Sequence, residues 1–253
     1  MYALNSVLIA TLLFVFILLA NEAGVRLGIR FRNQSDDDVK SQTTAIQGGI
    51  IGMLALILGF SFNMSLSRYD SRAGAEVAEA NAIGTAQLRT SLLPEPYDQQ
   101  AKQLLAEYID LRLTINHTDL TELTARRALN QETSELQQRI WNLGIEAAED
   151  HPNPVITGYF VTAINDMIDA QGYRNDQLQR HIPPSIFYLL FIIFVATSML
   201  TGYAGGLGRY RQRMPGFVLS FLICLLVFII IDLDRPRRGI IQVKQDSMEA
   251  LRG

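Results

Sequence analysis

Six residues within and just after one apolar run lie at helical spacing and combine small, polar and bulky types in a way that is unusual for a lipid-facing helix. The run Ala45–Ser65 contains glycine, serine and asparagine residues, for which a helix that faces only lipid has no use. At about 100° per residue, one stripe of the predicted helix collects small, polar and single bulky residues. Its members are Gly49, Gly52, Leu56, Phe60, Asn63 and Ser67. Such a stripe is typical of a protein interface or a water-filled lumen, and the alternative is small-residue packing within one subunit.

Leu56 and Phe60 lie one helical turn apart on that stripe. In a lumen, two bulky apolar side chains at this spacing would form a constriction that gates ion flow by dewetting. We therefore predict that the stripe lines a pore.

Charged residues follow the same run at helical spacing. Arg68, Arg72, Glu76 and Glu79 are three or four residues apart, which permits an ion pair between Arg72 and Glu76. The alternative is that the two arginines extend to lipid headgroups.

The sequence does not contain a pattern that indicates catalysis. Its histidines, His117, His151 and His181, lack the spacing that places two metal ligands on one helical face, and Cys224 is the single cysteine. No Walker loop, Gly-x-Ser-x-Gly elbow or Cys-x-x-Cys motif is present. Gly205-Gly206-x-Gly208 follows a predicted membrane helix and not a strand, so we expect a flexible turn there. We predict a protein that is not an enzyme and binds no cofactor.

Four apolar runs position these residues. They are Ser6–Ala20, Ala45–Ser65, Ile186–Tyr203 and Phe217–Ile231. With its flanks, each reaches the roughly 20 helical residues that cross a bilayer. The first run is followed, not preceded, by basic residues, so it predicts an anchor and not a removable signal peptide.

The segment between the second and third runs predicts helices. Apolar residues recur at helical steps around 101–115, 129–147 and 156–167, which predicts three amphipathic helices. Between Gly59 and Gly84 the single potential breaker is Gly74, so we expect the second membrane helix to continue beyond the bilayer. The predicted fold is all-α, with membrane helices in 1–65 and 183–231, a helical extramembrane domain in 66–182 and a charged tail in 232–253.

The predicted extramembrane domain is acidic. Residues 66–182 hold 10 Lys and Arg against 17 Asp and Glu, while the whole chain has a formal charge of −3. An acidic surface argues against nucleic acid as a partner, because phosphate binding needs a basic footprint. If this domain lined a vestibule, acids such as Glu76 and Glu79 would face the lumen and favour cations.

Several motifs resemble known membrane proteins. The string Phe60-x-x-Asn63-x-Ser65-x-x-Arg68-Tyr69-x-x-Arg72, preceded by Leu58-Gly59, resembles the second membrane helix of bestrophin channels. The chain as a whole resembles the bestrophin-like family of bacterial membrane proteins more closely. That resemblance is carried by Ser67–Arg72, Glu79–Thr85, Leu88-Arg89, Leu92–Pro94 and Asp232–Gly239.

The resemblance implies a homo-oligomer, with five subunits as the expected number, whose second helices surround a central axis. It implies that Leu56 and Phe60 form an apolar neck, whereas the third bulky position of the family falls on Gly52, so the neck would be shorter or wider. Anion and cation conductors are both known in the family, so the ion is left open, as are the gating stimulus and the physiological role.

Animal bestrophins carry an acidic calcium clasp after the last membrane helix. Here the corresponding stretch offers Asp232 and Asp234 before Arg235 and two further arginines, too few oxygen ligands for calcium. We predict no metal site and instead an ion-pair cluster at the membrane edge, which would join these aspartates to Arg68 or Arg72.

Two arguments about orientation disagree. The loops Asn21–Thr44 and Gly205–Pro215 hold seven Arg and Lys against five in the short tails, which places the helical domain outside the cytoplasm. The resemblance places it inside, and we follow the resemblance.

We predict an oligomeric ion channel of a bacterial inner membrane, in contact with lipid and conducting small inorganic ions. The alternative is a membrane-anchored scaffold or sensor whose helical domain binds another protein.

Overall fold

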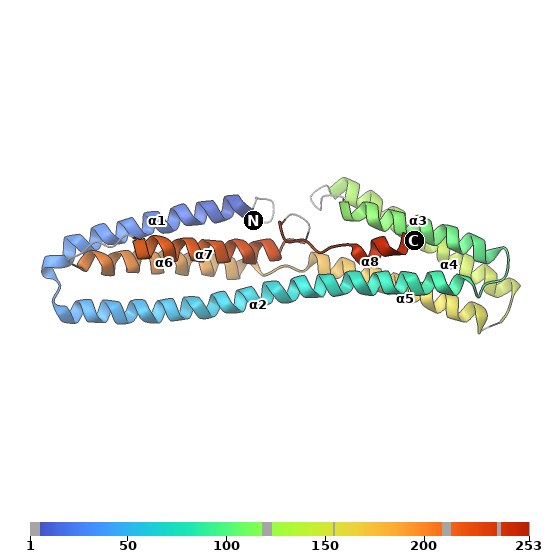
Figure 1. The fold of residues 1–253 in the computed structure, drawn as a ribbon, viewed down its shortest axis with the longest axis horizontal. Helices are drawn as coiled ribbons and strands as arrows, with labels where there is room; N and C mark the ends of the chain where they lie inside the picture. The colour runs from blue at the N-terminus through green and yellow to red at the C-terminus, as the bar shows by residue number, and fades with distance from the viewer. Residues whose placement is uncertain (1–5, 118–122, 154, 209–213, 237–238, 253) are drawn as a thin grey trace. The chain divides into compact units, whose positions relative to one another are not determined.

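The computed structural model describes residues 6–117, 123–153, 155–208, 214–236 and 239–252, and every regular element in them is helical (Figure 1). The elements are α1 (Ser6–Phe31), η1 (Arg32–Gln34), α2 (Asp37–Thr90), α3 (Tyr97–His117), α4 (Leu123–Asp150), α5 (Ile156–Gln179), α6 (Pro184–Leu207), α7 (Met214–Leu233), α8 (Asp246–Glu249) and η2 (Ala250–Arg252). The prediction of an all-α chain is confirmed.

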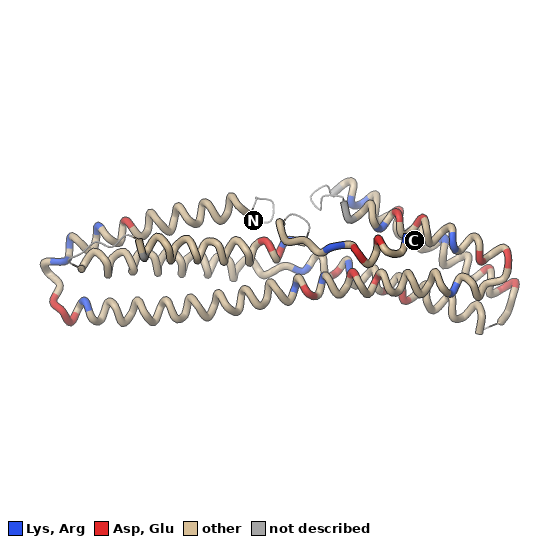
Figure 2. The backbone as a smooth tube through the Cα atoms, in the orientation of Figure 1, with Lys and Arg blue, Asp and Glu red and all other residues tan. Residues whose placement is uncertain are grey.

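Four stretches of the described residues are long and apolar enough to cross a membrane. They are Ser6–Gln34, Asp37–Thr90, Ile156–Leu207, which contains α6, and Gly216–Leu233. Figure 2 shows long charge-free lengths in α1, α2, α6 and α7. Two candidate spans therefore precede the helical segment and two follow it, as the apolar runs predict.

The chain forms two compact units, each with its own core. We call Met1–Ser67, His181–Arg235 and Gly239–Ile241 the membrane unit. We call Arg68–Arg180, Pro236–Arg238 and Gln242–Gly253 the polar unit. Helix α2 is 54 residues long and contributes to both, which confirms that it continues past Gly74.

Glycines bring α1 and α6 into close contact in the membrane unit. A Cβ atom on Gly202 would lie 2.1 Å from the carbonyl oxygen of Asn21, and one on Gly206 would lie 2.4 Å from that of Val25. The partners Gly24 and Gly28 on α1 are equally close to the backbone of α6. Both pairs have small-x-x-x-small spacing, which lets two membrane helices approach backbone to backbone.

This contact corrects two sequence predictions. Gly205 and Gly206 belong to α6, which ends at Leu207, so a flexible turn beginning at Gly205 is wrong. Most of Asn21–Thr44, predicted as a loop, is also helical, because α1 reaches Phe31 and α2 begins at Asp37. Packing of the Gly28 region against Gly206 stabilises helix in segments whose composition alone indicates turns.

Side-chain hydroxyl groups also join the helices of the membrane unit. Ser198 Oγ donates to the carbonyl oxygen of Ile17 at 2.8 Å, which links α6 to α1. Ser65 Oγ donates to the carbonyl oxygen of Ile230 at 2.7 Å, which links α2 to α7. The buried core around them is apolar and consists of Ile9, Leu13, Ile17, Leu54, Leu58, Ile182, Phe187, Leu190, Phe194, Cys224, Val227, Ile230 and Ile231.

The polar unit contains the three predicted amphipathic helices, α3, α4 and α5, together with the second part of α2. Their apolar faces form one core that includes Ile83, Leu105, Tyr108, Ile140, Phe160, Ile164 and Met167. The apolar residues that recur at helical steps in the sequence therefore lie on the helix faces that pack together.

Candidate functional site

All six residues predicted to line a pore lie on an exposed face of α2. Gly49, Gly52, Asn63 and Ser67 are exposed in the chain. The two bulky members of the stripe are exposed as well, Leu56 by 59% and Phe60 by 66%. In a membrane, exposed side chains of this size face lipid, further protein or a lumen.

The glycines of this face do not pack against any part of the chain that the structure describes. For a Cβ atom built on Gly49, Gly52 or Gly59, no other part of the described chain lies within 4 Å. Small-residue packing within one subunit is therefore the wrong explanation for these glycines. The glycines that do serve that purpose are on α1 and α6.

The opposite face of α2 fixes the orientation of the stripe. Leu54, Leu58, Ser61 and Ser65 are buried in the membrane unit. They fall about 180° from the stripe at about 100° per residue. Because these residues anchor α2, the stripe is held away from the core.

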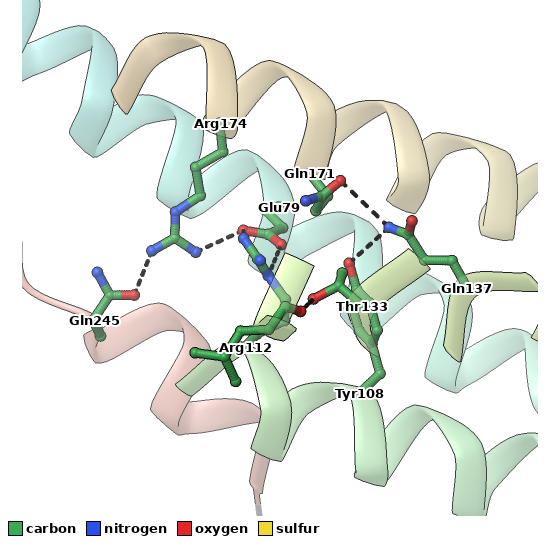
Figure 3. Close-up of polar contacts among 9 residues, drawn as sticks. Glu79, Tyr108, Arg112, Thr133, Gln137, Gln171, Arg174 and Gln245 are labelled. Atoms are coloured by element: carbon green, nitrogen blue, oxygen red, sulfur yellow. Dashed lines mark hydrogen bonds and ion pairs between the residues drawn. The ribbon is translucent and has the colours of Figure 1, made fainter. Parts of the chain in front are cut away.

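In the polar unit, α2 contributes a buried carboxylate to a charge network (Figure 3). Glu79 is fully buried, and its carboxylate accepts hydrogen bonds from Arg112 Nε and Arg174 Nη1, each at 2.6 Å. Arg174 Nη2 donates in turn to Gln245 Oε1. The network joins α2, α3 and α5 to the segment before α8.

Glu76 is buried one turn away from Glu79. Its Oε1 accepts a hydrogen bond from the backbone N–H of Met248 at 3.1 Å, and Met248 is itself fully buried. The prediction that Glu76 and Glu79 face a vestibule is wrong, because both carboxylates are used inside the polar unit. Arg72 is also buried, so it does not extend to lipid headgroups as the alternative supposed.

A neutral hydrogen-bonded group adjoins the network. Gln137 Nε2 donates to the hydroxyl oxygen of Tyr108 at 3.2 Å and to Gln171 Oε1 at 3.4 Å (Figure 3). Burial raises the pKa of Tyr108 well above its usual range, with the nearby Glu79 carboxylate acting in the same direction. The hydroxyl therefore stays protonated at all ordinary pH values.

Comparison with known proteins gives a consistent assignment. The model of the bestrophin-like domain family matches residues 14–248. The chain belongs to the bestrophin-like family. Three crystal structures of mutants of a bacterial Bestrophin homolog from Klebsiella pneumoniae share the fold, with TM-scores of 0.68, 0.70 and 0.68 at 16%, 15% and 15% sequence identity. Each covers 94% of this chain, and 95%, 94% and 95% of the homolog is covered in return. No curated protein sequence matches the chain.

In this bestrophin-like chain, Asp232 in the last turn of α7 and Asp234 just after that helix both bind backbone groups. Asp234 Oδ1 accepts the backbone N–H of Ile182 at 3.0 Å, ahead of α6, and Asp234 Oδ2 lies 3.6 Å from Nδ1 of His181. Asp232 Oδ2 accepts the backbone N–H of Ile241 at 2.8 Å. Both carboxylates are buried. Within the membrane unit, they join the end of α7 to Ile182, which precedes α6, and to Ile241, which follows α7.

Within the described residues, no group of three or more His, Cys, Asp or Glu side chains is placed to hold a metal ion. Arg235, next to these aspartates, is buried as well. Whether Arg68 or Arg72 pairs with Asp232 or Asp234 stays a prediction.

Sequence reasoning missed the arginine partners of Glu79. Arg112 lies in phase with the apolar residues Leu105 and Tyr108 of α3, and Arg174 lies in phase with Met167 of α5. A charged residue on an apolar helix face indicates a buried partner, because an unpaired buried charge is very costly. That signal was present, although it does not name the partner.

Proposed function

We propose that this bestrophin-like protein is an oligomeric ion channel in which α2 lines a central conduit. The observation that carries the proposal is the stripe on α2, which lies opposite the buried face and is exposed in the part of the chain that the structure describes. Lipid is a poor partner for that stripe because Asn63 is polar and the glycines leave gaps. Copies of the chain around an axis would turn these stripes toward a shared lumen.

The neck of this channel would consist of Leu56 and Phe60. They are the most exposed bulky residues on the stripe, and Gly52 leaves the next turn open. A two-residue apolar ring restricts ions by dewetting, since water leaves a narrow apolar passage. We assign the protein to a bacterial inner membrane, with the polar unit on the cytoplasmic side.

The test replaces Leu56 and Phe60 by alanine together. Ion flux through reconstituted vesicles should rise, because a wider and less apolar neck stays wet. The matched control is Phe221→Ala with Leu225→Ala, since these residues are also one turn apart and exposed, but lie on α7. The control should leave flux at the wild-type level.

Oligomer size is measured on the same samples. Unchanged flux from an intact oligomer carrying the Leu56 and Phe60 changes would contradict the neck. A monomer that does not conduct would favour the scaffold instead.

A further inference from the structure

The exposed stripe of α2 continues beyond Ser67 in the same helical phase. At about 100° per residue, the residues that follow on it remain within about 100° of arc. They are Asp70, Gly74, Val77, Ala78, Asn81, Thr85 and Leu88, and all of them are exposed. The buried residues of the polar unit's part of α2, including Glu79 and Ile83, fall on the opposite face.

Asp70 differs from every other member of the stripe because it is charged. Between Gly49 and Leu88, α2 contains four further charged residues, which are Arg68, Arg72, Glu76 and Glu79. These fall about 130° to 170° from the centre of the stripe. Three of the four are buried, and Arg68 is half-buried. The stripe therefore presents a single fixed charge.

We infer that Asp70 sets the charge preference of the conduit, as a ring of one carboxylate per subunit that concentrates cations and repels anions. This inference rests on the proposed function. Asp70 follows Phe60 by ten residues, or about 15 Å along the helix, so its ring would stand beyond the neck. A ring of like charges in a narrow passage raises the local concentration of the opposite charge, and salt screens this effect over about 10 Å at 0.1 M.

The positions of the other acidic residues indicate that Asp70, and not the total charge of the polar unit, sets the charge preference of the conduit. Glu79 is paired with Arg112 and Arg174, and Glu76 is buried against Met248, so neither presents charge to a lumen. The excess of acidic residues in 66–182 therefore does not by itself predict cation preference. Asp70, as the charged residue on the stripe, does predict a preference for cations.

The experiment measures the reversal potential across a KCl gradient for the full-length protein in planar bilayers. Asp70→Asn should lower the ratio of potassium to chloride permeability by about two- to tenfold, and Asp70→Lys should lower it further. Asp70→Glu should retain the wild-type ratio. The matched control Glu132→Gln removes an exposed carboxylate from α4 and should leave the ratio unchanged.

Salt dependence and chemical modification complete the test. The effect of Asp70→Asn should shrink at about 1 M salt, where the screening length is about 3 Å. If Asp70→Asn does not assemble, Asp70→Cys on a Cys224→Ala background allows the charge to be changed after assembly. A cationic thiosulfonate should then lower the permeability ratio.

Three results would overturn the assignment. An unchanged ratio in Asp70→Asn, with wild-type conductance intact, would reject Asp70 and leave the pore standing. An equal shift in Glu132→Gln would show that total charge, and not the stripe, sets the preference. Absence of conductance in the wild type would reject the proposed function and, with it, the role of Asp70.

Discussion

Arg112 donates two hydrogen bonds to the carboxylate of Glu79, from Nε to Oε1 at 2.6 Å and from Nη2 to Oε2 at 3.1 Å. Neither side chain reaches solvent. A bidentate pair of this kind is among the strongest ion pairs between side chains, and here it links α3 to α2. Arg174 adds a second guanidinium to the same carboxylate, so the loss of Glu79 would leave two buried arginines without it.

Glu79→Gln should lower the free energy of unfolding by about 3–5 kcal/mol, because it removes one partner of a buried ion pair and leaves the other charges uncompensated. Thermal and denaturant unfolding of the purified protein would measure the loss. The control is Glu107→Gln, which breaks the exposed pair with Arg139 and should change stability little. If Glu79→Gln and Glu107→Gln lowered the free energy of unfolding equally, burial would not be the reason that the Glu79 pair stabilises the protein.

The free energy of unfolding should fall less at alkaline pH in Tyr108→Phe than in the wild type. The folded-state pKa of Tyr108 is raised, so above about pH 10 the unfolded chain loses this proton while the folded chain keeps it. Stability present below that pH is then lost as the pH rises. At neutral pH the variant should be less stable by about 1 kcal/mol, because the bond from Gln137 is lost.

The measurement is the free energy of unfolding at several pH values between 8 and 11. The gap between wild type and Tyr108→Phe should narrow as the pH rises. A gap that stays constant would mean that Tyr108 titrates alike in both states.

Gly206→Ala should destabilise the membrane unit, because the added Cβ would lie 2.4 Å from the carbonyl oxygen of Val25. Overpacking of this kind costs about 1–3 kcal/mol or more. Gly205→Ala is the control, since a Cβ there meets no described atom within 4 Å. Melting temperatures in detergent would separate the two, and a similar loss at Gly205 would point to a backbone effect and not to helix contact.

The membrane-edge ion pairs are tested by a double-mutant cycle. Arg72→Gln and Asp232→Asn are made singly and together, and the stability of the oligomer is measured. If the two side chains pair, the effects should fall short of additivity by about 0.5–3 kcal/mol. Simple additivity would exclude that pair, and the same cycle with Asp234 or Arg68 would test the others.

The sequence by itself determined the four membrane helices, the three amphipathic helices and which residues share one stripe of α2. The four apolar runs, the three amphipathic periods and the phase of Leu56 and Phe60 depend on residues a few positions apart. Local helical geometry relates such residues directly, because each residue turns about 100° around the axis. The stripe on α2 could therefore be read before any packing was known, and so could its continuation to Asp70.

The tertiary structure alone decided which charged and small residues are buried and against what. The partners of Glu79 lie 33 and 95 residues away in the sequence, and no helical period relates residues at such distances. Gly206 lies in α6 and packs against Gly28, which belongs to a distant segment of the chain. Burial and pairing depend on contacts between segments that the chain brings together only on folding, which is why the sequence alone placed Glu76 and Glu79 on the wrong face. That Leu56 and Phe60 line a pore stays a prediction.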